Sequence, residues 1–246
     1  MANWSDPRPA DAATISAGSR SVAYDAGLRS YMLSVYNYMT SGVLLTGIVA
    51  MLFAPYAEAY LVNARGTGLS GLGWIVTFAP LAFIVVMNAG LNRMSTFGLQ
   101  ACFWAFATTM GLSMSTVFLV YTEASIAQTF FATAAAFAGL SLYGYTTKRD
   151  LSAMGSFLIM GVVGLLVASL LNMWMQSGAL QLAISAIGVL VFAGLTAYDT
   201  QRIKSMYSYV AGSDMVGKTA IMGALSLYLD FVNMFQFLLS FLGQRD

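Results

Sequence analysis

Seven apolar segments recur along this chain, and they constrain its fold more than any other feature. Each is long enough for an α-helix to cross the roughly 30 Å of hydrocarbon in a bilayer, which takes about 20 residues. Lipid offers no partner to backbone N–H and C=O groups, so a spanning segment must satisfy them within a helix or a closed barrel. We therefore predict an all-α bundle of seven transmembrane helices. The segments cover residues 31–54, 71–91, 95–121, 125–146, 153–175, 179–200 and 220–241.

The composition supports lipid as the main solvent of the chain. Hydrophobic residues make up 59% of the sequence and charged residues only 9%, against about 45–50% and about 25% in soluble globular proteins. A net charge of +1 provides no concentrated basic surface, so we expect no nucleic-acid partner. The sequence has no His, and Cys102 is its single cysteine. These counts exclude zinc hydrolases and Ser/His or Cys/His nucleophilic sites, and we expect no cofactor.

The first 30 residues differ from the rest of the chain. They are polar, carry both signs of charge and include Pro7 and Pro9. They lack the apolar centre of a secretory signal peptide. We expect a flexible cytoplasmic tail over residues 1–30, with room for a short amphipathic helix, and a seven-span membrane domain over residues 31–246.

The basic residues predict the orientation of the seven spans. With the amino terminus on one side of the membrane, that side holds nine of the eleven Lys and Arg residues. By the positive-inside rule it is the cytoplasmic side, so we expect the carboxyl terminus outside and a multi-pass location in the inner membrane. The nine are Arg8, Arg20, Arg29, Arg93, Lys148, Arg149, Arg202, Lys204 and Lys218, and the other two are Arg65 and Arg245.

One carboxylate lies deep within the last span. Asp230 follows the expected cytoplasmic end of that span by about ten residues, or about 15 Å of helix. A charged carboxylate at that depth costs at least about 2.5–3.5 kcal/mol unless it is paired, protonated or facing water. Ser226, Asp230 and Asn233 share one helix face through their i, i+4, i+7 spacing, and we expect this polar stripe to face the bundle interior. The alternative is that Asp230, in its neutral form, only hydrogen-bonds a neighbouring helix.

A second carboxylate, Asp199, lies near the cytoplasmic end of the sixth span. Taken alone, it could be an interfacial group that reaches water and pairs with Arg202 one turn later. The sixth and seventh spans are consecutive and antiparallel, however, so Asp199 and Asp230 approach the same side of the membrane. The approach is closer if the sixth helix continues toward Ile203.

Two adjacent carboxylates in a low dielectric cannot both ionise cheaply, so they are expected to share a proton. In a chain without His, this pair is the natural candidate for a pH-sensing element. Loss of the shared proton leaves two negative charges that attract a divalent cation, and carboxylate oxygens suit Ca²⁺. The residues therefore favour a pH-gated cation path, with Asp199 and Asp230 as its metal-contacting groups.

Two stretches carry a family resemblance. LTAYDTQRIK at 195–204 and LSLYLDFVNMF at 225–235 resemble the paired carboxyl-terminal motifs of the Bax inhibitor-1 family. The resemblance extends over the seven spans, essentially everything after residue 30. It implies a fold in which the last helix is central and wrapped by the others.

The resemblance also implies a function. In bacterial members an aspartate pair on the sixth and seventh helices forms a pH-sensitive latch that controls a calcium leak, and by motif the pair here is Asp199 and Asp230. A basic residue at the cytoplasmic end of the second helix belongs to that latch, and Arg93 is the only candidate by position. We expect Tyr198 and Gln201 of the first motif, with Ser226 and Asn233, to be supporting polar groups. The chain lacks the acidic residue in the second span of some bacterial members and the basic tail of eukaryotic members.

Two other functions remain open. The chain could regulate membrane proteases or stress and cell-death proteins by direct contact, as some family members are described to do. Paired aspartates on consecutive spans also fit an intramembrane aspartyl protease, but such enzymes place one aspartate in a GxGD loop, whereas Asp230 follows Leu-Tyr-Leu. We therefore expect a channel and not an enzyme, with the bilayer, Ca²⁺ and other membrane proteins as partners.

Overall fold

The computed structural model describes residues 8–66 and 68–244, with side chains from residue 22 onward. Its elements are seven α-helices and one short 3₁₀ helix, η1, so the predicted seven-helix fold is confirmed for the described residues. All seven helices are long and apolar enough to span a membrane. The helices are α1 (Arg8–Leu61), α2 (Gly71–Gly90), α3 (Thr96–Met114) followed by η1 (Ser115–Leu119), α4 (Glu123–Thr146), α5 (Ser152–Met175), α6 (Gly178–Val210) and α7 (Met215–Leu242).

Short polar residues fix where the helices begin. The side chains of Ser70, Ser95, Thr122 and Ser177 each accept a hydrogen bond from a backbone N–H in the first turn of the helix that follows. These N–H groups have no partner within the helix, so such caps stabilise its start. The α6–α7 turn contains Gly212 at φ +76°, a left-handed conformation that glycine adopts at little cost.

Three boundaries differ from the predicted spans. α1 begins at Arg8, so the expected tail is helical from residue 8 to residue 30; residues 1–7 lie outside the described residues, and a division of the chain at residue 30 stays a prediction. α6 continues to Val210, beyond the predicted end at residue 200 and through Ile203, as the approach of the two aspartates requires. α7 begins at Met215, which places Asp230 close to the middle of the helix.

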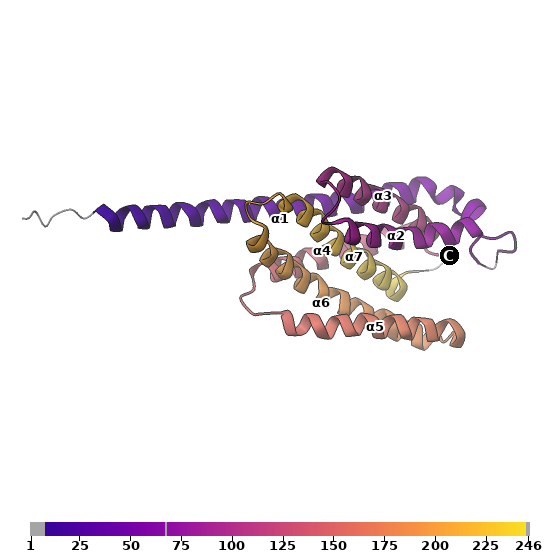
Figure 1. Cartoon of the computed structure of the whole chain (residues 1–246). Helices are drawn as coiled ribbons and strands as arrows, with labels where there is room; N and C mark the ends of the chain where they lie inside the picture. Colours follow the sequence, from indigo (N-terminus) through magenta and orange to yellow (C-terminus); the bar gives the residue numbers. More distant parts are fainter. Residues whose placement is uncertain (1–7, 67, 245–246) are drawn as a thin grey trace, which may run out of the picture.

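α7 lies at the centre of the bundle, as the family resemblance implied. Half of its most apolar window is buried, against 17–33% for the other six helices. It packs against α6, α1, α4 and α3. Figure 1 shows α7 between α1, α2 and α3 on one side and α5 and α6 on the other.

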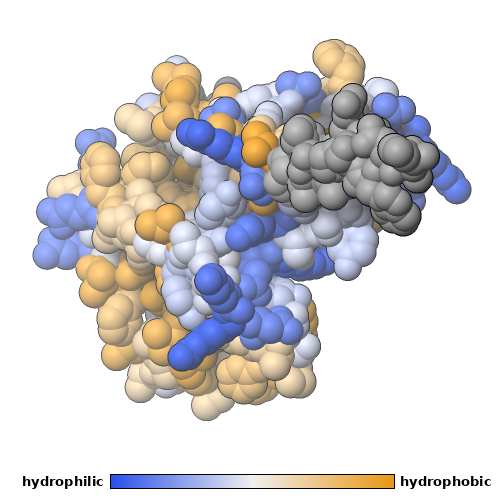
Figure 2. Space-filling model, turned by 90° about the vertical axis from the view of Figure 1, so that its left-hand side faces the viewer, coloured by the Kyte–Doolittle hydropathy of each residue, from blue (hydrophilic) through white to orange (hydrophobic). Residues whose placement is uncertain are grey.

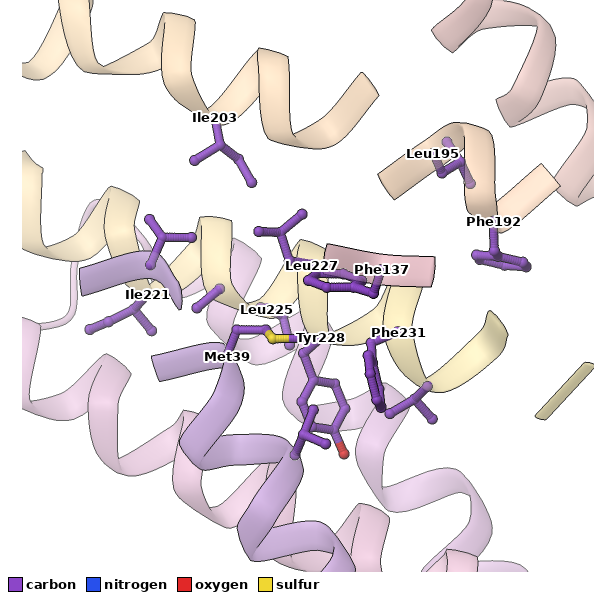
Figure 3. Packing of buried hydrophobic residues seen from close by; sticks show 14 of the residues in the cluster. Met39, Phe137, Phe192, Leu195, Ile203, Ile221, Leu225, Leu227, Tyr228 and Phe231 are labelled. Atoms are coloured by element: carbon purple, nitrogen blue, oxygen red, sulfur yellow. The ribbon is translucent and has the colours of Figure 1, made fainter. Parts of the chain in front are cut away.

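Aromatic side chains hold α7 in place. The ring of Tyr228 meets Phe106 of α3 edge to face, with 5.0 Å between ring centroids, and the ring of Phe231 meets Phe137 of α4 at 5.6 Å. Edge-to-face pairs at such distances add to the stabilisation from burial alone. Figure 3 shows Tyr228 and Phe231 projecting from α7 among the surrounding helices.

The surface of the bundle matches a membrane protein. Large apolar side chains are exposed along α5, among them Leu166, Leu170 and Trp174. Figure 2 shows the end of the molecule from which α1 emerges: hydrophilic residues gather across it, and apolar residues cover the flanks. Apolar flanks around a polar end are expected where lipid surrounds the helices and water meets their ends.

Candidate functional site: the seam between α6 and α7

Small residues and matching side chains bring α6 and α7 together along their length. A Cβ added at Gly223 of α7 would lie 3.0 Å from Ile203, and one added at Gly188 of α6 would lie 2.5 Å from Phe237. Small residues at such positions allow helices to approach each other closely. On α7 the seam follows residues 223, 226, 230, 233, 237 and 240, which alternate in steps of three and four. That spacing keeps one face of a helix against its antiparallel neighbour.

The register of this seam places both aspartates on it. Ile203 lies against Gly223, and the Phe192 ring stacks on Phe237 with 5.8 Å between centroids. Counting along the two antiparallel helices from these contacts places Asp230 level with Thr196 of α6, which is buried. Asp199 is one turn further toward the loop, about 4.5 Å along the helix. The expected approach of the two carboxylates is therefore produced by the helix pairing.

Asp230 is enclosed by the bundle. Its relative exposure is 4%, and its Oδ2 atom has no hydrogen-bond partner among the described residues. Asp199 is near enough to interact with it electrostatically. Buried polar groups are nearly always hydrogen-bonded, so this orphaned carboxylate oxygen is a feature that packing alone does not explain.

Asp199 has a different environment. Its side chain is 14% exposed, and its Oδ1 atom lies 4.0 Å from the guanidinium of Arg202, which is 57% exposed. A contact at this limit with an exposed partner is a weak ion pair. The alternative interpretation, in which Asp199 pairs with Arg202, is thus present in the structure, together with the approach to Asp230. Along the seam, Asp199 lies between the buried Asp230 and the exposed Arg202.

The two predicted polar neighbours on α6 face α5 instead of the aspartates. The ring of Tyr198 lies against Gly155, where an added Cβ would collide with it. The side-chain amide of Gln201 accepts a hydrogen bond from the backbone N–H of Leu151 at 2.9 Å and donates one to the carbonyl of Arg149 at 2.8 Å. Both residues therefore fasten α5 and the loop before it to α6.

On α7, Ser226 and Asn233 share the helix face of Asp230 through their spacing. Both are half-buried, above and below the buried Asp230. The side chain of Asn233 donates to the carbonyl of Leu229 on its own helix at 2.8 Å. Arg93 is exposed in the α2–α3 turn, and no ion pair joins it to either aspartate among the described residues, so its part in the latch stays a prediction.

Three hydroxyl contacts between helices were not predicted. The Tyr36 hydroxyl of α1 lies 2.6 Å from Ser141 of α4, which lies 3.0 Å from Thr200 of α6, directly after Asp199. Tyr228, in the second motif, shares a 2.6 Å hydrogen bond with Thr46 of α1. Isolated Ser, Thr and Tyr residues in apolar helices show no sequence pattern that identifies a distant partner. Of these five residues, only Thr200 and Tyr228 lie within the two motifs.

The carboxylates alone supply few metal ligands. Among the described residues, no group of three or more His, Cys, Asp or Glu could hold a metal ion. Two carboxylates offer at most four oxygens, whereas Ca²⁺ takes six to eight from protein and water. Two carboxylates alone would therefore leave most of a Ca²⁺ coordination shell to water or backbone oxygens.

Comparison with known proteins places this arrangement in a family. Residues 28–246 match the family model described as inhibitor of apoptosis-promoting Bax1. The chain belongs to the Bax inhibitor-1 family. It is 47% identical to the uncharacterized protein RP147 of Rickettsia prowazekii, over 94% of this chain and 97% of that protein. It is 45% identical to the inner membrane protein YbhL of Escherichia coli K12, over 89% of this chain and 94% of that protein.

The resemblance stated from the two motifs is thus confirmed at the level of the family. The matched region includes all seven helices from the middle of α1 onward. A similar protein of Caulobacter vibrioides, 44% identical over 94% of this chain, covers the same bundle. The chain is a multi-pass membrane protein of the Bax inhibitor-1 family, with two carboxylates on the seam between its last two helices.

Proposed function

We propose that this protein is a calcium leak channel in which Asp199 and Asp230 form a protonation-controlled gate. The observation that carries the proposal is the orphaned oxygen of Asp230, buried at the middle of the central helix beside a second carboxylate. An ionised carboxylate at this depth would be costly without a partner. A shared proton removes much of that cost.

The gate works through the charge on the seam. With one proton shared, the carboxylates attract each other and hold α6 against α7. When the proton leaves, two negative charges repel each other at short range and together attract a divalent cation. We therefore expect Ca²⁺ flux to rise as pH rises. Arg202, at the open end of the seam, weakly favours the ionised form of Asp199.

The orientation of the channel follows from the basic residues. Nine of the eleven Lys and Arg residues lie on the side that carries the amino terminus, which supports a cytoplasmic amino terminus and an external carboxyl terminus. The similarity to an inner membrane protein of Escherichia coli supports the same membrane here. Ca²⁺ would then enter the cell down its gradient.

The backbone at the two aspartates supports a channel over a protease. Both residues lie within uninterrupted helices, α6 and α7. Peptide hydrolysis by an aspartate pair needs an extended substrate next to the carboxylates, and neither helix opens a strand-like edge for one. We accordingly propose that the protein is not an enzyme.

Purified protein in liposomes that contain a calcium-sensitive dye tests the proposal. We expect flux from wild-type protein that increases with pH, and loss of the pH dependence in Asp199→Asn and Asp230→Asn. Asp150→Asn is the matched control, because Asp150 is an exposed carboxylate in the α4–α5 loop; it should behave as wild type.

The outcomes separate the candidate functions. Dye signals equal to those of empty vesicles would contradict the channel and favour regulation by contact with other membrane proteins. Flux that both seam variants leave unchanged would retain the channel but reject the aspartate gate. Cleavage of a helical membrane substrate, abolished by either variant, would establish the protease.

A further inference from the structure

A long groove runs between α1 and α4 on the side of the bundle. It consists of two cavities of about 830 Å³ and 580 Å³. Both are lined by Val43 and Leu44 of α1, Phe130 of α4 and Phe231 of α7, so they meet at this point. Leu33, Leu44 and Leu142 line the larger cavity and are also exposed, which shows that it opens sideways between the helices.

The walls of the larger cavity suit a hydrocarbon chain. Most of its lining side chains are apolar. Among the hydroxyl groups that line it, those of Tyr36 and Ser141 bond to each other at 2.6 Å. Groups that already satisfy each other require no hydrogen bond from an occupant. A groove that opens sideways at the depth of the bilayer core is in contact with acyl chains.

The groove has a charged mouth. Asp25 and Arg29 both line the larger cavity at its amino-terminal end. Their i, i+4 spacing places the two Cβ atoms about 5–6 Å apart on one face of α1. No ion pair within 4.0 Å is formed by either residue among the described side chains, so a positive and a negative group stand side by side, each available to a ligand.

The distance from the mouth to the end of the larger cavity is somewhat greater than the thickness of hydrocarbon in one leaflet. Arg29 and Val43 are separated by about 21 Å of helix, and half of the hydrocarbon core is about 15 Å thick. A chain anchored at Arg29 would therefore reach just past the middle of the bilayer, where the two cavities join.

We propose that this groove is a binding site for one phospholipid whose headgroup carries a phosphate and a primary ammonium group, as in phosphatidylethanolamine. The phosphate binds the guanidinium of Arg29, the ammonium group binds the carboxylate of Asp25, and one acyl chain lies along Val43, Leu44 and Phe130. An anionic headgroup without the ammonium would leave Asp25 opposed to negative charge.

Native mass spectrometry of the full-length protein tests this site. The protein is taken from mixed micelles that contain equal amounts of phosphatidylethanolamine and phosphatidylglycerol. We expect one retained phospholipid, enriched in phosphatidylethanolamine over the mixture. Asp25→Asn should lower that enrichment about 2- to 5-fold, the range expected for one exposed ion pair.

Two alanines of α4 give a matched pair of variants. Ala138 lines the groove and is exposed, so Phe fits there without repacking, whereas the exposed Ala135 lies outside the groove lining. Ala138→Phe should lose the retained lipid, and Ala135→Phe should keep it. Equal retention in these two variants would overturn the site.

Other results would contradict the proposal that a phospholipid occupies the groove. A dimer without bound lipid would show that a second copy of the chain covers the groove. A retained lipid with the composition of the mixture, unchanged in Asp25→Asn, would contradict the headgroup assignment. Neither Asp199 nor Asp230 lines the groove, so lipid retention is independent of the proposed gate.

Discussion

The seam between α6 and α7 carries two polar clusters that differ in how well they are satisfied. Near the carboxyl-terminal end of α7, the hydroxyl of Ser240 accepts hydrogen bonds from Ser185 at 2.9 Å and from Gln181 at 3.2 Å, both on α6. Gln181 in turn accepts one from Asn172 of α5 at 3.0 Å. At the middle of the same seam, Asp230 has a buried oxygen without a partner in the part of the chain that the structure describes.

From this difference we expect the serine cluster to contribute to stability and the aspartate cluster to respond to pH. The serine cluster consists of neutral groups that bond to one another, so a change of pH leaves its hydrogen bonds intact. These bonds connect α5, α6 and α7. The aspartate cluster holds charge in a place where charge is expensive. A single proton can change its energy, so it is the part of the seam where we expect opening to begin.

The largest expected effect comes from removing the charge of the aspartate cluster. A charge inside a membrane costs at least about 2.5–3.5 kcal/mol, and an energy of that size corresponds to a change in flux on the order of 100-fold between low and high pH. Asp199→Asn and Asp230→Asn should each remove this change, and the double variant should remove no more, because the pair shares one proton. Flux is measured in liposomes for the wild type, the two single variants and the double variant, which together form a double-mutant cycle. Independent, additive losses would show that the carboxylates act separately.

The next largest effect is expected from a substitution that disturbs the close contact between α4 and α6 beside the aspartate cluster. A Cβ at Gly144 would collide with the carbonyl oxygen of Ala197, two residues before Asp199. Gly144→Ala should destabilise the protein by about 1–3 kcal/mol, the usual cost of overpacking. Thermal unfolding in detergent measures this. Gly139→Ala on the same helix is the control, since an added Cβ there has open space; equal stability of the two variants would contradict the close approach.

Sequence patterns predicted the bundle well because lipid imposes a strong rule on length and polarity. They predicted too short an α6: the apolar segment ends near residue 200, shortly before Arg202 and Lys204, but the helix continues to Val210. In the structure the ammonium group of Lys204 donates to the carbonyl of Tyr145 at 2.8 Å and lies over the ring of the same residue. Long basic side chains reach the surface from within a helix in this way, so a charge marks a helix end only approximately.

The candidate site was predicted in part for a similar reason. Asp199 and Asp230 stand out because a carboxylate within an apolar segment is rare. Tyr198 and Gln201 share a motif with Asp199, but neighbours in sequence point in different directions on a helix, and both face α5. The hydrogen bond between Thr46 and Tyr228 joins residues far apart in the chain, and nothing local in the sequence encodes such a pairing.

A moderate effect is expected from the serine cluster. Ser240→Ala removes the acceptor of two hydrogen bonds between helices, and such bonds contribute about 0.6–1.7 kcal/mol in membranes. We expect a loss of stability of that size with the pH dependence of flux unchanged. Ser205→Ala is the control, because its exposed hydroxyl bonds only to its own helix. If Ser240→Ala altered the pH dependence of flux, the serine cluster would not be purely structural, which would contradict the distinction between the two clusters.

The smallest effect is expected at an exposed carboxylate. Hydrogen bonds from the hydroxyl and backbone N–H of Ser152 lower the pKa of Asp150, so the folded state favours the ionised form. This contribution to stability is present above about pH 4 and is lost as pH falls through the lowered pKa. Asp150→Asn should therefore slightly reduce stability at neutral pH and make no difference in strong acid. Denaturation curves at both pH values check this, and a larger effect than that of Ser240→Ala would contradict the ranking.

The shared proton itself can be observed by infrared difference spectroscopy of the protein in lipid during a pH titration. We predict a carbonyl stretch from a protonated carboxylic acid that disappears as pH rises, over the same range in which Ca²⁺ flux increases. The band should be missing in Asp230→Asn and retained in Asp150→Asn. A wild-type protein that shows no such band while its flux is low would contradict the central claim, because its seam would then be closed without a shared proton.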